Sequence, residues 1–163
     1  MVGIVLIKLG KPRDAKIWLR RALKKEPYTN EGRFFTTLAR VYVRLGAADK
    51  AWGVFSSRLR MQPEWYFAYA LYAQALMKEG KLLDKALRAI NKAAKERPRW
   101  PRFLVIRAQI YHKMKKKTQA KQDLLQAIKE ESGTSSMRRR HMALYRKLFG
   151  EEPTLIEKRK RSE

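Results

Sequence analysis

A recurring arrangement of small and apolar residues limits the folds open to this chain more than any other feature. Four alanines, at positions 15, 51, 86 and 120, are separated by steps of 36, 35 and 34 residues. Each is followed four residues later by a large apolar side chain, namely Leu19, Phe55, Ile90 and Leu124. This spacing places both residues on one face of a helix with 3.6 residues per turn. The sequence therefore predicts a series of similar helical units.

Residues 31–63 show one unit in full. The stretch predicts a helix, a tight reversal at Gly46, and a second helix that Pro63 ends, because glycine permits the reversal and proline cannot continue a helix. Further units are expected at 64–98 and 101–131, the latter opening with Pro101 in the first helical turn. Residues 1–9 predict half of a first helix, residues 12–26 the helix that follows it, and residues 136–149 a last helix with Ser135 or Ser136 as its N-cap.

Helix-turn-helix units with this spacing resemble the tetratricopeptide repeat (TPR) family. The resemblance covers residues 1–150 and implies an all-α fold, a right-handed α-solenoid of antiparallel helix pairs with about four units and a C-terminal capping helix. Residues 151–163 are expected to form a basic tail that has little to bury and extends from the last helix. One departure from the family pattern is Arg107, which stands where a leucine is expected.

The charge of the chain is far from balanced. Its 39 Lys and Arg residues against 15 Asp and Glu give a formal net charge of +24 and a pI near 10.7. An excess of one sign repels itself, so an anionic partner is expected to neutralise it. Nucleic acid, an acidic protein and an anionic membrane are the three classes of partner that the composition leaves open.

The chain has no cysteine, which excludes disulfides and thiolate metal sites. The apolar run at residues 2–7 is too short to span a membrane and lacks a basic leader or a cleavage site, so neither a transmembrane segment nor a signal peptide is predicted. We expect the chain to reside in the cytoplasm or the interior of an organelle. Because the ends of a solenoid need a polar cap, the half-helix at residues 1–9 is expected to be covered by a partner or by a preceding segment.

Catalytic motifs are missing from the sequence. His112 and His141 do not have metal-ligand spacing, and Gly10-Lys11 and Gly80-Lys81 lack the rest of a phosphate-binding loop. No nucleophile motif built on serine is present. The sequence therefore predicts a protein without enzymatic activity, metal or cofactor.

The TPR resemblance also implies where a ligand binds, since the first helices of successive units line a groove in this family. Counting back from each glycine turn, the resemblance places a set of basic, amide and aromatic residues in that groove, and no Asp or Glu falls at these positions. The expected function is a non-catalytic scaffold or adaptor for protein–protein interaction, whose basic groove docks an acidic protein or peptide. The groove residues are Arg33, Arg40, Arg44, Phe67, Gln74, Lys78, Arg102, Gln109, Lys113, Arg140 and Lys147.

Basic residues outside the groove support an alternative. Cations on both faces favour a large anionic surface, so the chain could instead be an RNA-contacting structural component of a ribonucleoprotein or ribosome-like assembly. Most aromatic residues fall at core positions, whereas Trp65 and Trp100, beside the helix-joining prolines, are candidates for exposed contacts or for hydrophobic staples. The candidate RNA surface comprises Lys92, Lys95, Lys116, Lys117, Lys121, Arg138 and Arg139.

Overall fold

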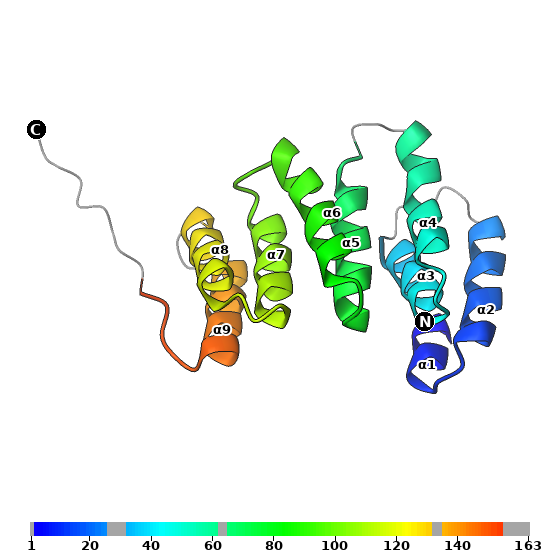
Figure 1. The fold of residues 1–163 in the computed structure, drawn as a ribbon, viewed down its shortest axis with the longest axis horizontal. Helices are drawn as coiled ribbons and strands as arrows, with labels where there is room; N and C mark the ends of the chain where they lie inside the picture. Colours follow the sequence, from blue (N-terminus) through cyan, green and yellow to red (C-terminus); the bar gives the residue numbers. More distant parts are fainter. Residues whose placement is uncertain (1, 26–31, 62–64, 132–134, 155–163) are drawn as a thin grey trace, which may run out of the picture. The chain divides into compact units, whose positions relative to one another are not determined.

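The computed structural model describes residues 2–25, 32–61, 65–131 and 135–154 (Figure 1). Within these ranges the backbone forms helices and turns without any strand, which confirms the predicted all-α fold. The helices are α1 (Val2–Lys8), α2 (Pro12–Lys25), α3 (Gly32–Arg44), α4 (Ala48–Met61), α5 (Phe67–Glu79), α6 (Leu83–Glu96), α7 (Pro101–Lys113), α8 (Lys117–Glu130) and α9 (Ser136–Phe149).

The chain falls into two compact units. Unit 1 is residues 1–96 and carries α1 to α6, and unit 2 is residues 97–163 and carries α7 to α9. Successive helices pair as α1 with α2, α3 with α4, α5 with α6 and α7 with α8. We call the first helix of each pair an A helix, and α9 takes the same place after α8.

The turns between paired helices have the backbone geometry that the glycines predicted. Gly46 and Gly80 adopt left-handed conformations with φ of 74° and 66°, which a residue without a Cβ atom enters at little cost. At the corresponding turn of unit 2 the residue is Lys115, with φ of 61°. Leu82, the residue before α6, also has a positive φ of 56°. Two side chains thus occupy conformations that favour glycine.

Two predicted helix starts in unit 2 are confirmed. Pro101 opens α7 directly after Trp100, where the missing N–H of proline has no helical partner to lose. Of the two serines proposed as the cap of α9, Ser135 is the one, because its Oγ accepts a hydrogen bond from the backbone N–H of Arg138 at 3.0 Å. Ser136 is the first residue of the helix.

The core of unit 1 is a sequence of apolar contacts between neighbouring helix pairs. One cluster joins α1, α2 and α3 and contains Ile7, Ala15, Leu19, Leu38 and Val41, all buried. A second set of contacts is aromatic and joins α3, α4 and α5 through Phe35, Trp52, Phe55, Trp65, Tyr69 and Tyr72. The second and third pairs of unit 1 therefore each pack on the pair before them.

The core of unit 2 joins α7, α8 and α9 through the buried residues Ala108, Leu124, Ile128 and Tyr145. Trp100 packs edge-on against Phe103, with ring centroids 4.7 Å apart, yet remains 40% exposed. Its counterpart Trp65 packs against Phe35 in unit 1 at 5.9 Å. Both tryptophans therefore contact a phenylalanine of their own unit.

Candidate functional site

Two arginines of the predicted groove hold a carboxylate of the chain itself. Arg40 and Arg44 lie one turn apart on α3, and both contact Glu79, the last residue of α5. The Nε atom of Arg40 donates to Oε1 of Glu79 at 2.6 Å, and Nε of Arg44 donates to Oε2. The Glu79 side chain is only 5% exposed. We call this arrangement the Glu79 clamp.

The clamp brings an acidic residue to two of the predicted groove cations. Glu79 stands one residue before Gly80, outside the positions predicted to line the groove, and its single negative charge is shared between Arg40 and Arg44. Arg44 makes a further bond, because its Nη1 donates to the backbone oxygen of Ile7 at 2.8 Å. Arg40 and Arg44 therefore join α3 to α5, and Arg44 also joins α3 to α1.

Lys78 is the groove cation of unit 1 that makes no ion pair among the residues the structure describes. Burial and the neighbouring Arg40 charge lower the pKa of its ammonium group. Phe67 and Gln74 are partly buried on the same helix. The side chain of Arg33, also predicted for this groove, lies outside the described part of the structure.

In unit 2 the predicted groove residues lie on the A helices α7 and α9. Lys113 and Lys147 are exposed and form no ion pair within residues 97–131 and 135–154. Arg140 is also exposed, and its Nη1 reaches only the sulfur of Met137, at 4.0 Å. Gln109 is partly buried, whereas Arg102 is exposed but has a pKa lowered by burial of its guanidinium group.

Four of the five acidic residues in the described part of unit 2 are held in ion pairs. Asp123 pairs with Arg107, Glu130 with Arg99, Glu151 with Lys121 and Glu152 with Arg146, while Glu131 accepts from the Ser135 hydroxyl at 3.5 Å. Four of the five carboxylates are therefore balanced by cations other than Lys113, Arg140 and Lys147, and Glu131 forms no ion pair with any described cation. We call Lys113, Arg140 and Lys147 the open cations of unit 2.

The pair of Arg107 and Asp123 was missed by the sequence reasoning. Arg107 of α7 donates from Nε and Nη2 to the two carboxylate oxygens of Asp123 on α8, each at 2.7 Å. The side chains are 25% and 11% exposed. The hydrogen bond to Asp123 raises the pKa of Arg107 despite the opposing effect of burial. An arginine at a leucine position was the available signal, since such a residue needs a buried partner.

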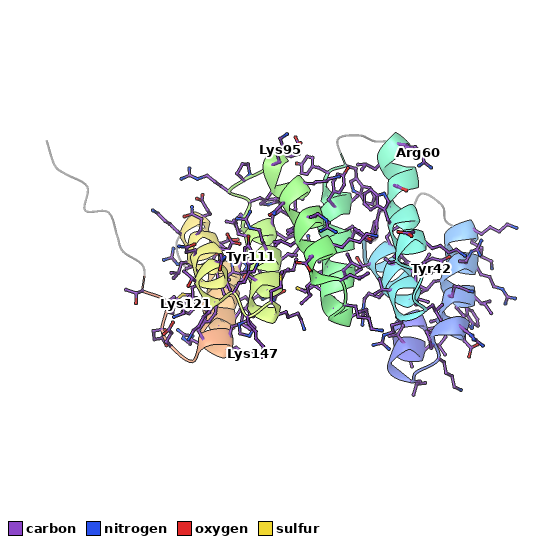
Figure 2. The ribbon with its side chains drawn as sticks, viewed as in Figure 1. Tyr42, Arg60, Lys95, Tyr111, Lys121 and Lys147 are labelled. Carbon is purple, nitrogen blue, oxygen red and sulfur yellow. The ribbon has the colours of Figure 1, made fainter. Side chains whose placement is uncertain are left out.

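Some residues of the candidate RNA surface contact other groups of the chain, and Figure 2 labels two members of the set, Lys95 on α6 and Lys121 on α8. Lys121 forms an ion pair with Glu151 and lies 5.6 Å from the centre of the Phe149 ring. Arg138 donates to the backbone oxygen of Glu131 at 3.2 Å. The ammonium group of Lys92 lies 5.5 Å from the centre of the Tyr69 ring. The exposed members, which pair with no carboxylate of the described residues, are Lys92, Lys95, Lys116, Lys117 and Arg139.

The beginning of the C-terminal tail is anchored, which differs from the extended tail expected from the sequence. Glu151 contacts Lys121 and accepts from the Tyr145 hydroxyl at 3.3 Å, and Glu152 pairs with Arg146 at 2.6 Å. These bonds hold the first tail residues against α8 and α9. Residues 155–163 lie outside the described part.

Among the described residues, His, Asp and Glu side chains do not gather in any group of three that could hold a metal ion. The helices in the same ranges are all too short or too polar to cross a membrane.

Comparison with known proteins places the helix pairs in a familiar architecture. Residues 101–133 match the sequence model of the tetratricopeptide repeat. No match was found among curated proteins. The fold is similar to that of TTC0263, a thermophilic TPR protein of Thermus thermophilus, with a TM-score of 0.54 and 23% identity over 91% of this chain and 80% of that one.

Two other solved structures give the same result. YrrB, a TPR protein with an unusual peptide-binding site, has a TM-score of 0.52 and 20% identity over 87% of this chain and 71% of its own. A tetratricopeptide repeat protein from Parabacteroides merdae has a TM-score of 0.51 and 22% identity over 91% of this chain and 57% of its own. At these identities the likeness establishes the fold.

Proposed function

We propose a function from the premise that this chain is a tetratricopeptide repeat protein, a family whose fold generally serves as a scaffold for protein–protein interaction. We infer that the chain is a non-catalytic adaptor, and that it docks an acidic, extended segment of a partner protein on the A-helix face of unit 2.

The observation that carries this proposal is that four of the five described acids in unit 2 are paired with cations outside the predicted groove set. Arg107, Lys121 and Arg146 each have a carboxylate partner, so their charges are already balanced. The open cations Lys113, Arg140 and Lys147 have no carboxylate partner within the described residues, and they lie on helices α7 and α9, which pack on one shared core. An acidic segment would supply the missing carboxylates.

Unit 1 contributes less to such docking in this proposal. The Glu79 carboxylate already binds the Nε atoms of Arg40 and Arg44 and balances one of their two charges, so an incoming carboxylate would have to compete with one that is fixed in place. Lys78 remains exposed and adds positive charge beside the clamp. We therefore assign the larger part of the binding energy to unit 2.

The expected energies are modest for each contact. An exposed ion pair contributes about 1 kcal/mol or less, so the three open cations together account for roughly 1–3 kcal/mol. Since a tenfold change in affinity corresponds to about 1.4 kcal/mol, removing them should weaken binding roughly ten- to hundredfold. Reversing their charge should weaken it further, because repulsion replaces attraction.

A dye-labelled oligoglutamate peptide tests the proposal by fluorescence anisotropy. The triple variant Lys113→Glu, Arg140→Glu, Lys147→Glu should lose most of its affinity for the peptide. A control with the same change in net charge is Lys116→Glu, Lys117→Glu, Arg139→Glu, which alters exposed cations at other positions of unit 2. The control should keep most of the affinity. Equal losses in both variants would show that net charge alone attracts the peptide.

The RNA alternative rests on the exposed cations of the second helices, Lys92 and Lys95 on α6 and Lys117 on α8, which also have no carboxylate partner in the described residues. A labelled polyuridine strand, titrated at several salt concentrations, separates the two functions. If the protein functions on RNA, the control triple variant should reduce both the affinity and its salt dependence, because phosphate contacts release counterions. Tight RNA binding with no measurable peptide binding would replace the adaptor proposal.

A further inference from the structure

Helices α1 and α2 carry large apolar side chains that are exposed. Val2, Val5 and Leu9 follow one another at helical spacing along α1 and its last turn, and their exposed fractions are 51%, 52% and 64%. Trp18 on α2 is 55% exposed. We call these four residues the N-terminal stripe. Apolar residues that gather on a surface in this way mark interaction sites.

The positions of the stripe repeat those of a surface that is buried elsewhere in unit 1. Val2, Val5 and Leu9 stand eight, five and one residues before Gly10, and Trp18 stands eight after it. At the same distances from Gly46 stand Leu38, Val41, Leu45 and Val54. These four residues of α3, its last turn and α4 pack on the cluster that contains Ile7, Ala15 and Leu19 of the preceding pair.

The next pair repeats the relation. Tyr72, eight residues before Gly80, contacts Trp52 and Phe55 of α4 at 5.2 and 6.0 Å between ring centroids. Glu79, one residue before Gly80, contacts Arg40 and Arg44 of α3. In both cases these positions face the helix pair that comes before. The N-terminal stripe is therefore the same stacking face, without a preceding pair upon it in this structure.

We propose that the N-terminal stripe binds a further amphipathic helix pair, which stacks on α1 and α2 as α1 and α2 stack on α3 and α4. The stripe continues an interface that the chain already uses twice, and this favours a helix pair as the occupant. The proposal concerns a surface separate from the open cations of unit 2, and it stands whether or not they bind a peptide.

The charges around the stripe specify the occupant further. Among the described residues, α2 exposes Arg13, Arg20, Arg21, Lys24 and Lys25, and its single acid is Asp14. Two copies of this basic surface would repel each other, which argues against a symmetric pair of these chains. A helix pair with acidic residues at the edge of its apolar face would be attracted instead.

A tandem extension of the full chain tests the stacking. A second copy of residues 2–37 placed directly before Val2 adds a helix pair in register, because 36 residues also separate Ala15 from Ala51. The added pair should raise Tm by several degrees. The double substitution Val5→Asp, Leu9→Asp in the original segment should abolish that rise, yet leave Tm of the unextended chain unchanged, since both side chains are exposed there.

Two outcomes would overturn the stacking. In the first, the extended chain has the same Tm as the original chain. In the second, the double substitution Val5→Asp, Leu9→Asp lowers Tm by the same amount in the extended and the original chain. Vesicles of phosphatidylglycerol test the competing occupant, a lipid surface. The stripe would be assigned to lipid if two results were obtained together. The unextended chain would sediment with these vesicles but its Val5→Asp, Leu9→Asp variant would not, and the extension would fail to raise Tm.

The acidic character of the occupant has its own test. Arg20→Glu and Arg21→Glu in the added copy alone should give a larger rise in Tm than the unaltered extension, and the excess should fade at high salt because screening weakens exposed charge pairs. If the altered and the unaltered extension raise Tm by the same amount at low salt, the proposal of acidic residues at the edge of the occupant is refuted.

Discussion

Replacement of Glu79 by glutamine should test the clamp, because the side chain keeps its shape and loses its charge. Removing one partner of a buried ion pair costs about 3–5 kcal/mol. Here Arg40 is 19% exposed and Arg44 is 37% exposed, so water compensates part of the loss and we expect about 2 kcal/mol. For a chain of this length that corresponds to a fall in Tm of about 4–8 °C.

The assay is thermal unfolding followed by circular dichroism, with Glu96→Gln as the matched control. Glu96 is exposed at the C-terminal end of α6 and forms no ion pair with the described residues, so its neutralisation should leave Tm nearly unchanged. Glu79→Gln should also free Arg40 and Arg44, and thereby strengthen binding of the oligoglutamate peptide. If Glu79→Gln and Glu96→Gln have the same Tm and peptide affinity, the clamp contributes neither stability nor competition.

Three further predictions concern unit 2. Asp123→Asn should lower the free energy of unfolding by about 2–3 kcal/mol because it leaves the Arg107 guanidinium without its charge partner, whereas the double variant Arg107→Leu, Asp123→Ala should recover most of that loss in urea denaturation. Burial lowers the pKa of His141 below its usual value of 6.5, although the charge of Glu131 acts in the opposite direction. The folded state therefore favours the neutral imidazole, and its contribution to stability is complete above about pH 6.5 and is lost as the pH falls. His141→Leu should therefore flatten the loss of Tm between about pH 7 and pH 5, and an unchanged pH profile would contradict the role of His141. Lys115→Gly should raise the stability by about 1 kcal/mol in the same denaturation assay, because glycine removes the strain of a positive φ; a loss of stability would show that the lysine side chain has contacts that outweigh the strain.

Local signals in the sequence predicted most of the fold. Gly46 and Pro101 act on their own backbone, and the periodic alanines fix which face of each helix is buried. These effects need no knowledge of the neighbouring pair. For that reason the all-α architecture and the turn positions follow from the sequence.

The candidate site was less predictable because it depends on contacts between pairs. Counting from each glycine identified Arg40 and Arg44 but not Glu79, whose carboxylate reaches them from the next pair, 39 and 35 residues away in the sequence. Likewise, nothing in the local sequence connects Arg107 with Asp123, which stand 16 residues apart on different helices. Spacing within one helix predicts the face on which a residue lies. It does not predict which charged side chain of a neighbouring helix contacts that residue.

The bond from Arg44 to Ile7 has a consequence for the order of folding. The helix α1 is seven residues long, too short to be stable alone, and the carbonyl group of Ile7 is bound by a side chain 37 residues further along. The same carbonyl accepts from the backbone N–H of Gly10 at 3.2 Å, a local bond that can form early, whereas the bond from Arg44 requires α3 to be in place. We expect α1, although it precedes α3 in the sequence, to dock stably only once α3 has formed.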